Sequence, residues 1–121
     1  MITPMFASHF ARDWIAAWNS HSLARILEHY ADDFEFASPY IAHTGFAAAG
    51  RLRGKAEVGA YWAAGLERLP DLHFELQGAY AGVSSVALHY RGALGRMAIE
   101  VFDFDAQRPD KVIRSAAQYA A

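Results

Sequence analysis

The chain has 121 residues, of which 54% are hydrophobic and 20% charged, and its formal net charge is −2. This length fits one ordinary domain, and this composition excludes a disordered chain. Its densest basic group, Arg51, Arg53 and Lys55, is too small for nucleic-acid binding, which requires clustered cations against phosphates. There is no cysteine, so disulfides and thiolate chemistry are excluded.

The N-terminal residues 1–5 lack a basic start followed by an apolar run, so no signal peptide is expected. No apolar stretch approaches the ~18 residues of a membrane span. We therefore expect a soluble cytoplasmic protein that meets neither nucleic acid nor membrane. Aromatic residues make up 14% of the chain, which is more than a small core needs. A lined cavity or a subunit interface would use the excess.

The first helix is predicted to begin at Thr3-Pro4, which supplies an N-cap hydroxyl and the residue preferred at the first helical position. A second, shorter helix is expected after Ser22, which can cap it. The apolar face of the first helix shows one aromatic residue every four positions, a spacing typical of a packed helix. These residues are Phe6, Phe10, Trp14 and Trp18.

Asp32-Asp33 is interpreted as a turn that leads into an alternating strand at residues 34–38, which Pro39 ends. Residues 39–53 form a long connection. Connections longer than about 12 residues are often lids or binding loops, although part of this one could form a short strand. A third helix follows Gly54, shows strong helical periodicity and stops before Pro70.

The remaining sequence predicts a meander of four strands at residues 72–80, 83–91, 96–104 and 111–119. The short turns between them imply antiparallel neighbours. Three helices in the N-terminal half, followed by consecutive strands, define an α+β layout within a single domain covering residues 1–121.

The strand at residues 96–104 is apolar on both faces. Ala98, Glu100, Phe102 and Phe104 share one face, and Met97, Ile99, Val101 and Asp103 share the other. Helices can cover one face, which leaves the other for a second subunit, so we predict a homodimer through the outer face of the sheet.

In order and spacing, several stretches resemble the SnoaL-like proteins of the nuclear transport factor 2-like superfamily. The stretches are WIAAWN (14–19), YADDFEFASP (30–39), RGKAEVGAYW (53–62), LPDLHFEL (69–76) and the strand pair EVFDF…KVIR (100–114). The resemblance implies a cone-shaped roll, also called cystatin-like, in which a curved antiparallel sheet wraps around the helices and a cavity. It implies frequent dimerisation through the outer sheet face but little about activity, because the fold hosts many functions.

Within that superfamily, the ketosteroid isomerases place an aspartate base just before the proline that ends the first strand, where this chain has Ser38. They also place an oxyanion-stabilising tyrosine on the first helix, where it has Trp14. Their protonated aspartate on the third long strand matches Glu100. Only one of these three catalytic residues, the buried acid, has a counterpart in this chain, which argues against steroid isomerisation.

Glu100 is the leading catalytic candidate, because alternation directs its carboxyl into an apolar cavity, where burial would raise its pKa. Pairing with an arginine or with the dimer partner is the alternative for this residue. Tyr40 and His43, in the long connection, could polarise a ligand oxygen, although His43 could equally be a surface histidine.

The histidine spacings form no metal motif, so no metal site is expected. The candidate ligand-binding residues are Trp14, Trp18, Phe36, Ser38, Tyr61, Trp62, Phe102 and Tyr119.

The leading hypothesis is a small-molecule-pocket protein that acts as a cofactor-free acid/base enzyme, an isomerase, dehydratase or cyclase, on an apolar oxygen-bearing metabolite. The alternative is a non-catalytic ligand-binding or dimerisation domain, which explains Ser38 without further assumptions. A protein-partner adaptor is a third hypothesis and would need an exposed apolar patch outside the dimer face.

Overall fold

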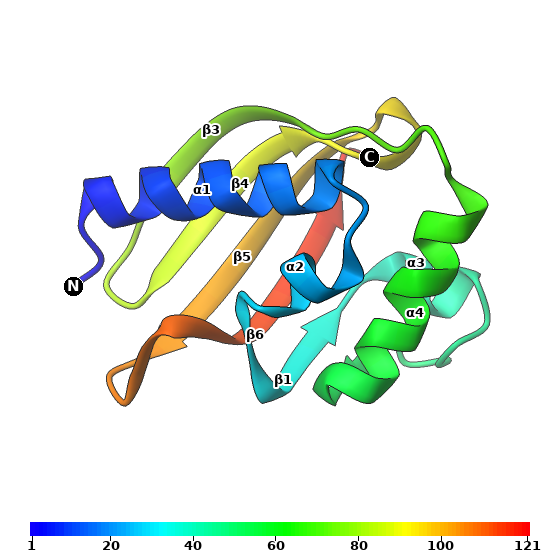
Figure 1. The fold of residues 1–121 in the computed structure, drawn as a ribbon, viewed down its shortest axis with the longest axis horizontal. Coiled ribbons are helices and arrows are strands. Elements are labelled where there is room, and N and C mark those ends of the chain that lie inside the picture. Colours follow the sequence, from blue (N-terminus) through cyan, green and yellow to red (C-terminus); the bar gives the residue numbers. More distant parts are fainter.

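The computed structural model describes residues 1–121 and contains six strands, four α-helices and one short 3-10 helix (Figure 1). The helices are α1 (Pro4–Asn19), α2 (Leu23–Leu27), α3 (Pro39–His43), α4 (Gly54–Arg68) and η1 (Ala93–Gly95). The strands are β1 (Tyr30–Ala37), β2 (Arg51–Arg53), β3 (Glu75–Ala81), β4 (Ser85–Arg91), β5 (Met97–Asp105) and β6 (Arg108–Tyr119).

The strands form one sheet in the order β2-β1-β6-β5-β4-β3. All neighbours are antiparallel except β1 and β6, which run parallel. The predicted α+β layout is therefore confirmed, with one pairing that the turn argument did not predict. That argument holds only for strands joined by short turns, whereas β1 and β6 are far apart in sequence and need a long crossover.

Helix α1 lies across β3, β4 and β5, and α4 lies on the β1 side of the sheet (Figure 1). The N-cap of α1 is as predicted, since the Thr3 hydroxyl accepts a hydrogen bond from the Phe6 backbone N–H at 3.0 Å. At its other end, Asn19 is joined to the backbone of Phe74 by two hydrogen bonds of 3.0 and 2.7 Å. These contacts fix the end of α1 against the start of β3.

The prediction of a turn at Asp32-Asp33 is wrong, because both residues belong to β1. The register between β1 and β6 is irregular in this part of the strand, and both side chains are exposed. Asp32 pairs with Lys55 at 3.4 Å and Asp33 with Arg108 at 3.2 Å. Lys55 and Arg108 thus pair with two acidic residues that turn preference alone would place in a loop.

The long connection at residues 39–53 contains α3 and β2, so part of it does form a short strand. The Ser38 hydroxyl caps α3 by accepting the Tyr40 backbone N–H at 3.3 Å, and Pro39 occupies the first helical turn. The Ser38 backbone N–H donates to the Gly50 carbonyl at 2.9 Å, which closes the loop onto the end of β1. The connection therefore contains regular secondary structure and is not an irregular loop.

The outer face of the sheet carries Ile99, which is 48% exposed, at the centre of β5. On the same face, Arg114 bridges Glu35 and Asp103 at 3.5 and 3.4 Å. The homodimer through this face stays a prediction, which sedimentation of the purified protein would test. None of the helices is long and apolar enough to cross a membrane.

Candidate functional site

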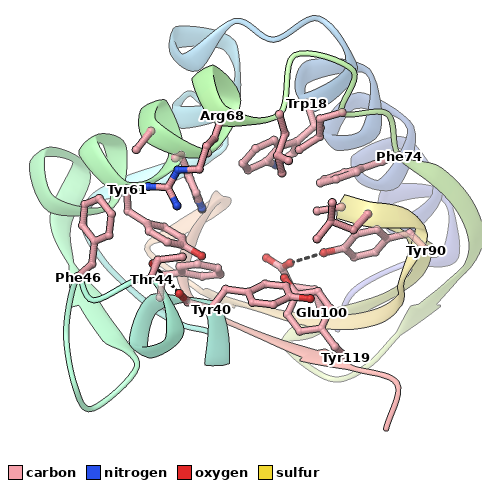
Figure 2. A pocket seen from close by; sticks show the side chains of 18 of the residues that line it. Trp18, Tyr40, Thr44, Phe46, Tyr61, Arg68, Phe74, Tyr90, Glu100 and Tyr119 are labelled. Carbon is pink, nitrogen blue, oxygen red and sulfur yellow. Dashed lines mark hydrogen bonds between the residues drawn. The ribbon is translucent and has the colours of Figure 1, made fainter.

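A cavity of about 250 Å³ lies where the C-terminal halves of α1 and α4 approach α3 and the ends of β4, β5 and β6 (Figure 2). Hydrophobic residues make up 15 of the 19 that line it. The other four are Thr44, Gly65, Arg68 and Glu100, so the lining has one cationic side chain and one carboxyl group. The hydrophobic lining is Trp14, Trp18, Phe36, Tyr40, Phe46, Tyr61, Trp62, Ala64, Leu69, Leu72, Phe74, Tyr90, Ala93, Leu94 and Tyr119.

Glu100 lies at the sheet side of this cavity, in the middle of β5 between Leu88 and Ala117 of the flanking strands. It is 3% exposed and is the one buried residue with an acidic or basic side chain. The Tyr90 hydroxyl donates to its Oε1 at 2.8 Å (Figure 2). Burial raises the pKa of Glu100 to about 7, although the bond from Tyr90 acts in the opposite direction. The carboxyl group can therefore give or take a proton near neutral pH.

Four tyrosine hydroxyls surround this carboxyl group. Burial raises the pKa values of Tyr30, Tyr61, Tyr90 and Tyr119, and the nearby Glu100 carboxylate raises each of them further. Their phenols therefore stay protonated and act as neutral hydrogen-bond donors. Tyr61, Tyr90 and Tyr119 line the cavity itself, whereas Tyr30 lies behind it.

Behind the cavity, Trp14 Nε1 donates to the Tyr30 hydroxyl at 2.9 Å. Ser115, on the neighbouring strand β6, lowers the pKa values of both Tyr30 and Glu100. The Ser115 hydroxyl itself is buried and has no partner at hydrogen-bonding geometry. Trp18 Nε1, in the cavity wall, is also buried without an acceptor. A buried donor without a partner is uncommon in folded proteins and often marks a functional region.

Tyr40 is held by Arg96, whose Nη1 donates to the Tyr40 hydroxyl at 2.8 Å and whose Nη2 donates to the Ala120 carbonyl at 2.8 Å. The same guanidinium lies over the rings of Tyr40 and Tyr119, 5.8 and 5.7 Å from their centroids. Since the Tyr40 oxygen accepts from Arg96, its own proton remains available for a ligand. The C-terminal end of the chain thus helps to position two cavity tyrosines.

Eight of the residues that the sequence indicated do line the cavity. They are Trp14, Trp18, Phe36, Tyr40, Tyr61, Trp62, Glu100 and Tyr119. His43 does not, because it lies on the exposed side of α3, with its ring 6.0 Å from that of Tyr40. Ser38 is buried and its hydroxyl is turned to the start of α3, so Ser38 lies behind the residues that line the cavity.

Phe102, predicted as a wall residue, lies in the solid core instead. The rings of Phe10 and Trp14 cover it, with centroids 4.9 and 5.2 Å away. Phe102 follows Glu100 on the same face of β5, but two residues further along the strand the interior is filled by α1. Alternation determines the face of a strand residue, whereas the filling of the interior determines whether a cavity lies beside it.

Sequence reasoning missed three polar residues of the site, Thr44, Arg68 and Tyr90. Tyr90 was detectable, because placing His89 on the outer face of β4 turns Tyr90 inward. Arg68 had no comparable signal, since it appears in the sequence as an exposed residue in the last turn of a helix. Neither here nor elsewhere in the chain do three or more His, Asp or Glu side chains gather as a metal ion would require.

The sheet and the helices that pack against it have the nuclear transport factor 2-like, or cystatin-like, fold. The model of the SnoaL-like domain matches residues 11–114, so the chain belongs to the SnoaL-like family. No curated protein matches its sequence.

The chain is similar to a SnoaL-like protein of unknown function from Burkholderia thailandensis E264. The two are 54% identical over 99% of this chain and 98% of that one, with a TM-score of 0.93. It also resembles AclR from Streptomyces galilaeus, proposed to be a hydroxylase, at 19% identity, 98% and 77% coverage and a TM-score of 0.73. A nuclear transport factor 2-like protein of unknown function from Cytophaga hutchinsonii ATCC 33406 matches at 10% identity, 99% and 95% coverage and a TM-score of 0.70. The last two likenesses show the fold alone.

Proposed function

We propose that this protein is a small-molecule-pocket enzyme that performs cofactor-free acid/base chemistry on a mostly apolar, oxygen-bearing metabolite. The reaction class is isomerisation, dehydration or cyclisation, since these need only positioned acids and bases. The observation that carries the proposal is the carboxyl group of Glu100, buried at the side of an apolar cavity and hydrogen-bonded by Tyr90. A general acid or base works best when its pKa lies near the working pH, and burial raises that of Glu100 to about 7.

In this proposal Glu100 transfers the proton and two tyrosines orient the ligand oxygen. Tyr90 is already bonded to the carboxyl group, so it fixes the direction of Oε1 and stabilises the ionised form. Tyr40 accepts a hydrogen bond from Arg96 and can donate its own proton to a ligand oxygen, which would polarise it. His43 does not line the cavity, so the proposed mechanism gives it no role.

The cavity suits a ligand of about one or two rings. An apolar cavity of about 150 Å³ is large enough for benzene, and this one measures about 250 Å³. Its walls include the rings of Trp18, Trp62 and Phe74, which offer flat apolar surfaces to a planar or nearly planar body.

A non-catalytic ligand-binding domain is the second candidate, and one observation favours it. Glu100 is the sole acidic residue of the lining, so an enzyme here must work with a single carboxyl group. Ser38, where the ketosteroid isomerases carry their base, is engaged in capping α3. A binder needs no second acid.

The two candidates are separated by a ligand screen by thermal shift on the wild type and on Glu100→Gln, followed by product analysis for each compound that binds. For an enzyme we expect the variant to retain binding while turnover falls at least ~100-fold, the usual contribution of a general acid or base. Glu75→Gln, an exposed residue on β3, is the matched control and should keep full turnover. Binding without turnover in the wild type would establish the binder instead, and full turnover in Glu100→Gln would exclude the proposed role.

A further inference from the structure

Arg68 is the one permanent charge that faces the cavity. It lies in the last turn of α4, and among the 19 lining residues it is the one cation, as Glu100 is the one carboxylic acid. Because the pKa of Glu100 is raised to about 7, its carboxyl group is mostly neutral below that pH. Under those conditions Arg68 is the one charged side chain of the lining, and its charge is positive.

No protein group neutralises this cation. Three other arginines, Arg53, Arg108 and Arg114, form ion pairs with carboxylates at 2.8 to 3.5 Å. Arg68 has neither a salt bridge nor a hydrogen bond, although it is a residue with five donors. A guanidinium that the fold leaves unpaired beside an apolar cavity is available for an anion brought by the ligand.

The helix position explains the charge of this residue but not the direction of its side chain. A cation in the last turn of a helix is favoured by the helix dipole wherever its side chain points. Figure 2 shows the Arg68 side chain turned toward Tyr61 at the edge of the cavity. Its charge slightly lowers the pKa of the Tyr61 hydroxyl, which burial raises. Both side chains line the cavity.

We propose that the cavity takes small apolar carboxylic acids, whose carboxylate pairs with Arg68 at the rim while the hydrocarbon body lies among the aromatic walls. This inference rests on the proposed function of the cavity as a small-molecule site. It gives the ligand a fixed direction, with the acid group at the rim and a second oxygen facing Glu100 and Tyr90. The planar guanidinium fork matches a carboxylate in two parallel hydrogen bonds, and the apolar walls suit the hydrocarbon body of such an acid.

The test compares matched acids and amides, phenylacetate against phenylacetamide and cinnamate against cinnamamide, by calorimetric titration at a pH below 7. Each pair has the same shape, so the ratio of their dissociation constants isolates the charge. We expect the wild type to bind each acid about tenfold more tightly than its amide, since one charged bidentate contact is worth about that much. In Arg68→Gln the ratio should fall to about one, and in the wild type it should shrink with added salt.

Arg25→Gln is the matched control, because Arg25 is also an exposed, unpaired arginine in the last turn of a helix, but does not line the cavity. Its acid-to-amide ratio should equal that of the wild type. Equal affinities for acid and amide in the wild type, or an unchanged ratio in Arg68→Gln, would overturn the inference and leave the small-molecule pocket standing. If neither series binds at all, both the inference and the proposed function fail.

Discussion

Replacing Glu100 by glutamine should make the protein more stable at alkaline pH, although it alters the centre of the candidate site. The pKa of this carboxyl group is raised from its ordinary value of 4.5 to about 7 by burial. The folded state therefore holds the proton more tightly than the unfolded state. Its contribution to stability is complete below about pH 4.5 and is lost as the pH rises through 7.

The size of the effect follows from the same pKa values. One pKa unit corresponds to about 1.4 kcal/mol, so the wild type should lose about 3 kcal/mol from this group between acidic and alkaline pH. Glutamine has the same shape and no charge, so the variant avoids this loss. Below about pH 5 the two proteins should agree within about 1 kcal/mol, the net value of an altered hydrogen bond with Tyr90.

Urea unfolding of both proteins at several pH values measures the difference directly. Titrating groups that do not interact with Glu100 are the same in both proteins and cancel in that difference. Glu75→Gln, on an exposed surface, should follow the wild type at every pH. If the stability difference between Glu100→Gln and the wild type were the same from acidic to alkaline pH, the carboxyl group would not be desolvated and the reasoning would be refuted.

Three further substitutions test neighbouring parts of the argument, all by urea unfolding. Tyr90→Phe removes the bond that favours the ionised form of Glu100, so the pH at which stability falls should move upward; an unmoved midpoint would contradict this. Asn19→Ala removes both bonds to the Phe74 backbone and should cost about 1–3 kcal/mol. Arg53→Met breaks an exposed ion pair and should cost less than about 1 kcal/mol. A loss for Asn19→Ala no larger than that for Arg53→Met would contradict the role given to that contact.

The predictable parts of the fold are those with a local physical signal. The N-cap at Thr3 and the four-residue spacing of aromatic residues locate α1, because both act within a few residues of the chain. The inward direction of Glu100 follows from alternation along β5. Both expectations needed no knowledge of distant partners.

The parallel pairing of β1 with β6 could not be predicted in this way. It joins Glu35 to Arg114 and Phe36 to Ser115, residues almost 80 positions apart, and no turn between them carries the information. Asp33 also belongs to β1, where its exposed side chain pairs with Arg108 of β6. Turn-forming residues signal loops only where no distant strand competes for them.

The candidate site shows a similar division. Which aromatic residues face inward was predictable, but not which of them border empty space, and Phe102 and Trp14 illustrate the difference. The contact between them fills the interior beside β5, while the other side of Trp14 borders the cavity. The direction of the long, flexible Arg68 side chain depends on packing that sequence spacing does not encode.

The cap at Ser38 has a consequence for how this scaffold could change its chemistry. Aspartate caps helices as well as serine does, so Ser38→Asp would preserve the start of α3 while introducing a second buried acid. The hydroxyls of Tyr61 and Tyr119, whose pKa values Ser38 now lowers, would lie near the new carboxyl group. A single substitution would thus place a second acid behind a lining in which Glu100 is now the sole carboxyl group.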